Sequence, residues 1–474
     1  MQSETRWSVP PVSAMSRSVL LRALAASIVT GEQNVDSIRA RLARTVGKNW
    51  RWLRPLAARY VETFGGGVRP RQRDVVQFLS RDKGLGRARS KYFDQLWVPE
   101  WLNEPQRMQP VWAAARWDVP PIESVGALAE WLGLEIGDLL WFADLKGLGY
   151  RLKHPQLRHY HYRVLTKPSG NIRLIEAPKN RLKDVQRKIL SRILERVPPH
   201  PAAQGFLKGR SIKTFAGPHV GRRVVLRMDL QDFFPTFAAA RTQTFFRVMG
   251  YPESVADLLG GLCTSATPRD VWKDLAGKVD PNVVWEARSL YARPHLPQGA
   301  PTSPALANLC AYRVDCRLAG LAKSVGAEYT RYADDLAFSG GEAFEKRVER
   351  FSIHVAAILI EEGFQVNHRK TRVMRQGVRQ HLAGLVANQR LNIMRPEFDR
   401  LKATLTNCVH KGPGGQNREE HPQFYAHLEG RVRFVEMVNP DKVSVCAICM
   451  SGLCGHERGL PQAELGDVSL SLSL

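Results

Sequence analysis

Hydrophobic positions in the first third of the chain recur at the spacing of an α-helix. Across residues 124–145 the apolar positions repeat with a period of about 3.6, and the repeat is interrupted at Gly133, which predicts two helices broken at that glycine. A second apolar run, Val19–Val29, contains Arg22 and is too short to cross a bilayer. It predicts a helix and no membrane anchor, so we expect a mostly helical region over residues 1–155.

The hydrophobic pattern changes from helical to alternating after residue 156. Residues 161–178 (HYRVLTKPSGNIRLIEAP) alternate apolar and polar positions on both sides of a Pro-Ser-Gly-Asn turn, which predicts a β-hairpin. Residues 181–197 return to helical spacing and place Lys and Arg on the opposite face. That basic face suits contacts with phosphates and simple solvation equally well.

Three further patterns follow one another along the chain. The run 224–229 (VVLRMD) predicts an apolar strand that ends in an aspartate. Residues 295–309 (HLPQGAPTSPALANL) predict a Pro-rich turn followed by an apolar helix. In 329–340 (YTRYADDLAFSG), two adjacent aspartates lie between apolar half-strands, which predicts a hairpin with acids at its bend.

Helical spacing returns near the C-terminus. Residues 396–409 and 422–438 each predict a helix, and the charged, Gly-rich segment 411–421 between them predicts a flexible connection. We therefore expect a helical region over 389–440 and a separate tail over 441–474.

Size and charge narrow the class of partner. A chain of 474 residues is too long for one ordinary hydrophobic core and predicts two or three packed units. Its 69 Lys and Arg against 45 Asp and Glu give a formal charge of +24, which favours a polyanionic partner such as nucleic acid. Nine of the eleven Trp lie within residues 1–155. We interpret them as core residues, with stacking on a nucleic-acid base as the alternative for one or two.

The cysteines indicate a reducing compartment. All seven lie from Cys263 onward and their spacing shows no disulfide framework, so we expect a cytoplasmic protein. Cys446, Cys449, Cys454 and His456 have the ligand types of a zinc site, but their spacing is irregular. We therefore expect ordinary thiols there and no structural Zn²⁺.

Three aspartates carry the candidate chemistry. Nucleotidyl transfer uses one divalent cation to activate a hydroxyl and a second to neutralise the triphosphate, and carboxylate oxygens suit Mg²⁺. Asp229 and the pair Asp334 and Asp335 are far apart in sequence, but the predicted strands would deliver them to one place. An adjacent pair of acids is more often simply solvated, so the hypothesis depends on the surrounding motifs.

Those motifs resemble the ordered blocks of reverse transcriptases. The resemblance is carried by YADD at 332–335, DLQDFF at 229–234 and LPQGAPTSP at 296–304, and it covers roughly residues 159–388. Within that family the chain looks most like bacterial retron reverse transcriptases. The supporting segments are AAQGFLKGRSI at 202–212, FAGPH at 215–219, EGFQVNHRKTR at 362–372 and HLAGLVAN at 381–388.

The resemblance implies a metal site for two Mg²⁺ ions, with Mn²⁺ as a substitute. Its ligands would be the carboxylates of Asp229, Asp334 and Asp335 and the backbone carbonyl of Leu230. Phe234 falls where the family places a steric gate against the ribose 2′-OH. A buried core position is the blander interpretation, and it suits the neighbouring Phe233 better.

Other residues match positions that contact substrates in the family. Lys167 and Arg173 would grip the triphosphate of a deoxynucleotide, because cations on a hairpin suit a phosphate clamp. Gln298 and Gly299 would line the nascent base pair.

Further residues would contact nucleic acid. They are His219, Lys370 and Gly384, although a simple surface lysine explains Lys370 nearly as well. Two segments depart from the retron pattern: 215–219 reads Phe-Ala-Gly-Pro-His where Asn-Ala-x-x-His is usual, and 382–384 reads Leu-Ala-Gly where Val-Thr-Gly is usual. Both segments are associated in the family with reading its own RNA, so the retron subtype depends on them.

The implied architecture is an α+β right-hand polymerase. Fingers and a palm with a small antiparallel sheet would occupy 156–388, a helical thumb 389–440, and a mostly helical extension would precede them. The implied activity is copying of a structured non-coding RNA from a 2′-OH primer, which leaves a branched RNA–DNA product. Such enzymes commonly act in anti-phage defence with a separately encoded effector, and without an RNase H signature after the thumb, template removal would need host RNase H.

Three alternatives remain open at this point. A group II intron-like enzyme would need further domains, for which the roughly 85 residues after Asn388 leave little room. Another defence-associated reverse transcriptase would share the same aspartates. A non-catalytic RNA-binding scaffold on a polymerase fold would not need them.

Overall fold

The chain folds into two compact, helix-rich units. The computed structural model describes residues 16–92, 95–99, 101, 106–151, 154–166, 170–275 and 277–442. One unit contains the described residues up to His200 together with Asp232–Tyr312, and the other contains Pro201–Gln231 together with the described residues from Arg313 onward. Among these residues the strands form small antiparallel sheets of two, four and three strands. The α+β class is thereby confirmed, while the boundaries at 155, 388 and 440 stay predictions.

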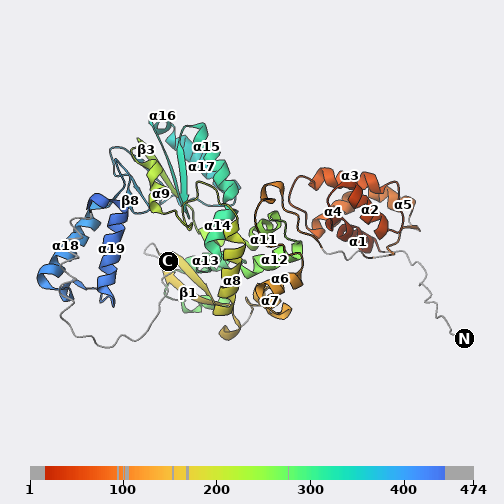
Figure 1. The fold of residues 1–474 in the computed structure, drawn as a ribbon, viewed down its shortest axis with the longest axis horizontal. Helices are drawn as coiled ribbons and strands as arrows, with labels where there is room; N and C mark the ends of the chain where they lie inside the picture. Colours follow the sequence, from red (N-terminus) through yellow and green to blue (C-terminus); the bar gives the residue numbers. More distant parts are fainter. Residues whose placement is uncertain are drawn as a thin grey trace. The chain divides into compact units, whose positions relative to one another are not determined.

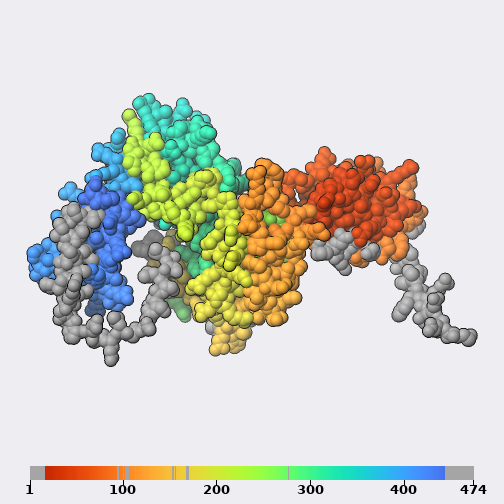
Figure 2. Space-filling view, in the orientation of Figure 1, coloured from red at the N-terminus to blue at the C-terminus, as the bar shows by residue number. Residues whose placement is uncertain are grey.

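Helices near the N-terminus form a bundle with a core of its own (Figure 1). Leu24 and Ile28 of the first helix pack with Leu42 of the second, and none of the three has exposed surface. The space-filling view shows these helices as one closely packed body (red in Figure 2). No described helix is long and apolar enough to cross a membrane. The helices are α1 (Arg17–Val29), α2 (Val35–Thr45), α3 (Leu53–Phe64), α4 (Gln72–Arg81) and α5 (Lys83–Lys91).

The tryptophans of the N-terminal region are less buried than predicted. Trp112 is 91% exposed, and no described Trp before residue 155 is among the fully buried residues. Trp50 and Trp52 lie at the margin of the bundle core and Trp7 lies outside the described residues. The core prediction is therefore wrong for the exposed members, because the helix cores are filled by Leu, Ile, Val and Ala, whose smaller side chains pack between the helices. The exposed members are Trp97, Trp101, Trp112 and Trp141.

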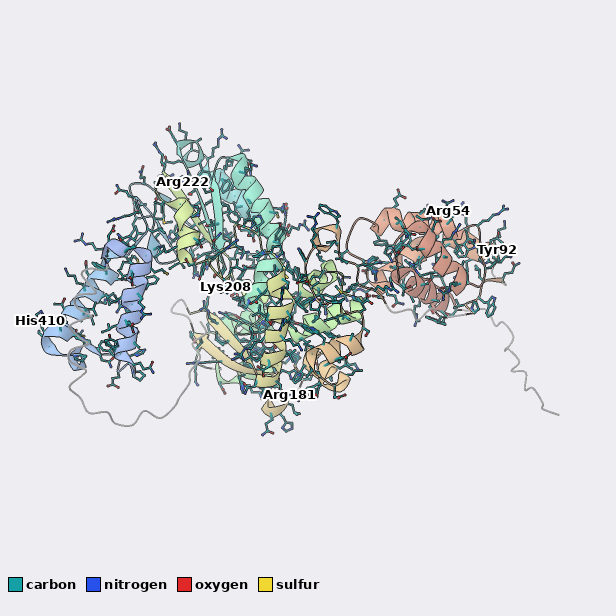
Figure 3. All side chains as sticks on the ribbon, viewed as in Figure 1. Arg54, Tyr92, Arg181, Lys208, Arg222 and His410 are labelled. Atoms are coloured by element: carbon teal, nitrogen blue, oxygen red, sulfur yellow. The ribbon has the colours of Figure 1, made fainter. Side chains whose placement is uncertain are left out.

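The predicted helical pair is confirmed as α6 (Val125–Leu132) and α7 (Ile136–Ala143). Gly133 ends α6 with a φ of 74°, a left-handed conformation that favours glycine. The basic face of α8 (Asn180–Arg192) contacts this pair: Arg181, labelled in Figure 3, bonds Asp138 at 2.7 Å, and Lys188 lies 5.2 Å from the Trp131 ring. Part of that face is thus occupied by protein contacts.

The predicted hairpin over 161–178 is confirmed. Strands β1 (Tyr160–Thr166) and β2 (Ile172–Pro178) pair antiparallel, with Thr166 opposite Ile172 at the turn. Ile172 and Leu174 pack against later helices of the same unit. Among those helices is α13 (Pro281–Tyr291), which supplies Ala287 and Tyr291 to this cluster. The same unit also contains α10 (Phe233–Thr236), α11 (Ala239–Val248), α12 (Glu253–Leu262) and α14 (Ser303–Cys310), the last of which confirms the predicted helix after the Pro-rich turn.

The second unit is built on a four-stranded antiparallel sheet in the order β4-β5-β3-β6. Its central strand β3 is an apolar run, as predicted, and it pairs with β5 on one side and β6 on the other. Because β3 is flanked on both sides, its residues are held in register by two ladders. The strands are β3 (Val224–Asp229), β4 (Glu328–Tyr332), β5 (Asp335–Gly340) and β6 (Arg372–Arg375), and the associated helices are α9 (Ile212–Ala216), α15 (Tyr312–Ser324), α16 (Glu342–Glu345) and α17 (Val348–Glu361).

The C-terminal part of this unit combines a small sheet with two helices. Leu401 and Leu405 of the first helix and Val432 of the second join a core that also contains Val225 of β3. Both predicted helices are confirmed. The elements are β7 (His381–Leu382), β8 (Leu385–Val386), β9 (Asn392–Ile393), α18 (Arg395–Lys411) and α19 (Phe424–Val438).

Candidate active site

Strand pairing in the second unit brings the three predicted aspartates together. Asp229 is the last residue of β3 and lies opposite Asp335, the first residue of β5. Asp334 occupies the two-residue turn between β4 and β5, and its carbonyl accepts the backbone N–H of Leu230 at 2.9 Å. The apolar strands end at this point and deliver three carboxylates to one edge of the sheet.

The turn that carries Asp334 is tightly enclosed. Ala333 precedes it with a φ of 54°, which is uncommon for a residue with a Cβ. A Cβ at Gly205 would lie 2.9 Å from the backbone nitrogen of Ala333, so only glycine allows this approach. The surroundings therefore hold the turn in a conformation that its own residues do not favour.

A buried ion pair lies behind the turn. Arg331 bonds Asp315 at 2.8 and 2.6 Å, and neither side chain has exposed surface. Arg331 also donates to the carbonyl of Ala333 at 3.2 Å, and Tyr329 donates to Asp315 at 2.8 Å. This pair was not predicted from the sequence, although an arginine between aromatic residues, three positions before the acids, is a signal of a buried charge there.

Two basic residues that the sequence analysis did not assign to the metal site contact its carboxylates. Lys370 bonds Asp229 at 2.9 Å, and Arg227 grips Asp335 with bonds of 2.7 and 2.9 Å. Arg227 lies two residues before Asp229 and so points to the same face of β3. For Lys370, the predicted contact with nucleic acid stays a prediction, since its side chain is more than half exposed.

The third carboxylate is in a different electrostatic situation. Burial, together with the charges of Asp229 and Asp335, raises the pKa of Asp334 to about 6. Burial also raises the pKa of Asp335, although Arg227 works in the opposite direction. A cation bound between these carboxylates would offset their mutual repulsion.

The donor set fits a hard divalent cation. Three carboxylates and the nearby carbonyl of Leu230 offer oxygen ligands only, as Mg²⁺ prefers. In the described residues no three acidic, His or Cys side chains yet converge on one metal position, because Asp229 and Asp335 are turned to Lys370 and Arg227. The predicted zinc ligand types at 446–456 lie outside the described residues.

The structure corrects one predicted contact with nucleic acid. His219 has no exposed surface and lies between the hydroxyls of Ser339 and Thr330, at 2.6 and 2.7 Å. Burial lowers its pKa to about 3, so the ring is neutral. The prediction of a contact with nucleic acid is wrong for His219, because the sheet encloses its side chain. The imidazole instead links Ser339 of β5 to Thr330 of β4. Gly384 is exposed, with a φ of 83° in the turn between β7 and β8, and its predicted contact is not tested.

The predicted nucleotide-binding residues lie in the first unit. Arg173 is exposed on β2, and Phe234 is half-buried on α10 beside the buried Phe233. Backbone bonds connect these segments to the Pro-rich turn: Gln298 accepts the N–H of Glu176 of β2 at 2.8 Å, and Leu296 donates to Phe237 after α10 at 3.2 Å. The turn thus links the segments that carry Arg173 and Phe234.

Gly299 allows the Pro-rich turn to lie close to the backbone of β2. Its φ is 129°, and a Cβ there would lie 3.0 Å from the carbonyl oxygen of Glu176. The buried side chains of His295 and Glu176 are bonded at 2.8 Å and anchor the same turn. Burial opposes the protonated, charged form of His295, but the neighbouring carboxylate of Glu176 outweighs this effect and raises the pKa of the histidine. The sequence analysis missed this pair. Lys167 lies outside the described residues.

Comparison with known proteins agrees with this geometry. The family described as reverse transcriptase (RNA-dependent DNA polymerase) matches residues 165–394, which include all three aspartates. The chain is therefore an RNA-directed DNA polymerase, and this domain carries the right-hand polymerase fold.

Similar proteins narrow the class. The retron Mx65 reverse transcriptase of Myxococcus xanthus is 40% identical over 69% of this chain and 71% of its own length. The retron Mx162 reverse transcriptase of the same organism is 37% identical over 72% of this chain and 70% of its own length. The retron Ec86 reverse transcriptase of Escherichia coli is 32% identical over 52% of this chain and 69% of its own length. The chain belongs to the retron reverse transcriptases.

Proposed function

We propose that this enzyme copies a structured non-coding RNA into DNA at a metal site formed by Asp229, Asp334 and Asp335. The observation that carries the proposal is the placement of these three aspartates at one edge of the sheet, at the end of β3 and in and after the β4–β5 turn. Two divalent ions, Mg²⁺ or Mn²⁺, would supply activation of the primer hydroxyl and neutralisation of the triphosphate. Leu230 would add its backbone carbonyl to the ligands.

The basic partners of the carboxylates have a role in this proposal. Lys370 and Arg227 balance the negative charge of Asp229 and Asp335 when no cation is bound, which lets the aspartates stay close together. Cations held by the aspartates would take over this neutralisation, and the side chains of Lys370 and Arg227 would then be free to interact with phosphates. Lys370 is the better placed of the two for primer or template, because its side chain is 57% exposed.

The first unit would position the incoming nucleotide. Arg173, with Lys167, would bind the triphosphate, and Gln298 and Gly299 would border the nascent base pair. Phe234 would exclude a ribose 2′-OH, which its half-buried position allows. Replacing Phe234 with Ala should then raise ribonucleotide incorporation relative to deoxynucleotides by a factor equivalent to about 1–3 kcal/mol, measured in competition assays; an unchanged ratio would return the residue to the core.

The fold would divide as in other right-hand polymerases. We assign fingers and palm to 156–388, with the four-stranded sheet as the palm, and the thumb to α18 and α19 within 389–440. By the family resemblance described above, the RNA would be a transcript specific to this enzyme, primed from its own 2′-OH and joined to the DNA copy; the relatives named as retron reverse transcriptases support this assignment. A role in anti-phage defence, a separate effector and template removal by host RNase H extend the proposal.

Primer extension tests the core of the proposal. Asp335→Asn should abolish incorporation of deoxynucleotides on a generic RNA template, as should EDTA, while Arg347→Gln, on the exposed surface, should extend at the wild-type rate. Extension by Asp335→Asn at an undiminished rate would refute the site. RNA purified with the enzyme tests the finer part: one dominant structured transcript bonded to a short DNA supports it, and a diffuse RNA mixture without DNA opposes it.

A further inference from the structure

A basic cavity in the first unit has no role in the chemistry described above. It has a volume of about 910 Å³ and lies between the segment after α7 and the segments around α13. Of the eleven described residues that line it, five are Lys or Arg, against 69 of 474 in the whole chain, so basic residues are enriched about threefold. The five are Lys146, Arg151, Arg269, Lys273 and Arg288.

The charge of this cavity is not neutralised from within. None of the five basic residues forms an ion pair with a described carboxylate, and all five are exposed. The only acid in the lining, Asp270, is bonded by Arg158. Arg269 is held by Tyr150, whose hydroxyl lies 2.6 Å from its Nε. Convergent cations without acidic partners are the electrostatic pattern of a polyanion site.

Aromatic side chains adjoin the cations. Tyr150 lines the cavity, and its ring lies 5.6 Å from the guanidinium of Arg269. On α13, Trp285 is 68% exposed and precedes Arg288 by three residues, which places the two on the same side of the helix. Cations that bind phosphates, beside flat rings on which bases stack, are typical of single-stranded nucleic-acid sites.

We infer that this cavity binds an unpaired segment of RNA, with Lys273 and Arg288 contacting phosphates and Trp285 stacking on a base. The inference rests on the proposed function only in taking RNA as the polyanion. A volume near 910 Å³ exceeds what one phosphate group fills and admits a short stretch of strand. The site would hold RNA apart from the segment being copied.

Binding measured without nucleotides tests the inference. The probe is a fluorescent 20-nucleotide oligouridylate, titrated with the full chain at several KCl concentrations. The double variant Lys273→Gln, Arg288→Gln should bind about tenfold more weakly at 0.15 M salt, and its salt slope should fall by roughly 1.4, since each lost single-strand contact removes about 0.7. A matched control is Lys323→Gln, Arg350→Gln, which removes one Lys and one Arg from exposed helical positions elsewhere.

Each outcome decides the inference. An unchanged affinity and salt slope overturns it, as does an equal loss in the control pair, which would reduce the effect to net charge. A raised KM for deoxynucleotides with unaltered oligouridylate binding also overturns it, because the cavity would then be a triphosphate site. Trp285→Ala should weaken binding while leaving the salt slope unchanged, which separates stacking from charge. Because no nucleotide is present, the result is independent of whether the Asp335→Asn enzyme extends a primer.

Discussion

Two hairpin turns of the second unit begin alike but differ at their second residue and in their surroundings. Each contains two residues between paired strands and begins with an alanine at positive φ, 54° at Ala333 and 46° at Ala383. The second residue is Asp334 in one and Gly384 in the other. Asp334 is half-buried among other charges, whereas a Cβ at Gly384 would meet no atom within 4 Å.

The comparison shows where strain is tolerated. A glycine satisfies the backbone of the open turn at no cost, as its φ of 83° requires. The enclosed turn has an aspartate at its second position without a positive φ, and its backbone strain lies at Ala333, which the contacts from Gly205 and Arg331 hold in place. For Asp334 the unfavourable contribution is electrostatic, because burial and the neighbouring carboxylates oppose its ionisation.

The largest expected effect comes from changing the second residue of each turn. Asp334→Asn should abolish primer extension, because the change would remove a carboxylate that we propose as a metal ligand, and with it several kcal/mol of transition-state stabilisation, about a thousandfold in rate or more. Gly384→Asn should leave extension of an artificial primer-template within severalfold of wild type, since Asn tolerates positive φ. Comparable extension by both variants would contradict the difference drawn between the turns.

The next effect concerns the ion pair that supports the enclosed turn. Arg331→Met should lower the free energy of unfolding by about 3–5 kcal/mol, because Asp315 would keep a buried charge without its partner. Arg375→Met, which removes an exposed pair with Glu345 from the same sheet, should cost less than about 1 kcal/mol. Denaturant unfolding measures the free energy of unfolding of both variants. Equal losses would show that the buried pair stabilises the fold no more than the exposed pair does.

A smaller effect has the opposite sign. With the pKa of Asp334 raised to about 6, the folded protein binds its proton more tightly than the unfolded chain does, so ionisation of this carboxyl destabilises the fold above pH 6. Without divalent ions, Asp334→Asn should therefore raise the free energy of unfolding by roughly 2–3 kcal/mol at pH 8. The gain should shrink between pH 6 and pH 4, where wild-type Asp334 becomes protonated in both states. A gain that does not depend on pH would point to a cause other than charge.

The smallest effect compares the first residues of the turns. Ala383→Gly should stabilise the fold by up to about 1 kcal/mol, because it relieves a left-handed backbone at a half-buried site. Ala333→Gly should be close to neutral, since the same relief is offset by the loss of a methyl group that is 93% covered. Thermal unfolding of the two variants side by side would detect a difference of this size.

Sequence patterns anticipated the local elements of the enzyme well. The hairpins around 161–178 and 329–340 and the helices broken at Gly133 follow from periodicity and turn residues, and all are present. The meeting of Asp229 with Asp334 and Asp335 was also predicted, and strand pairing provides it.

Contacts between distant segments were not predictable in the same way. The Arg331–Asp315 pair joins a strand to a helix, and no local pattern names the partner of a buried charge. His219 matched a family segment that reads RNA, yet hydroxyls from two strands enclose it. The exposure of Trp112 was unpredictable for the same reason, because burial depends on which segments pack around a residue, and the sequence alone does not show this.

The main chain has a consequence for redesign of this polymerase. Residues 229–231 are tied to the β4–β5 turn and to 365–367 by backbone hydrogen bonds, from Leu230 to Asp334, from Gln231 to Gln365 and from Asn367 to Asp229, at 2.8–2.9 Å. No side chain takes part in these three bonds, so side chains around the site can be exchanged without changing the spacing of the segments that carry the carboxylates. Directed evolution for altered nucleotide or template use can therefore vary the exposed side chains near the site while the three aspartates, Gly205 and Arg331 are kept. Insertions and deletions between 229 and 231 or 365 and 367 should be excluded from any library.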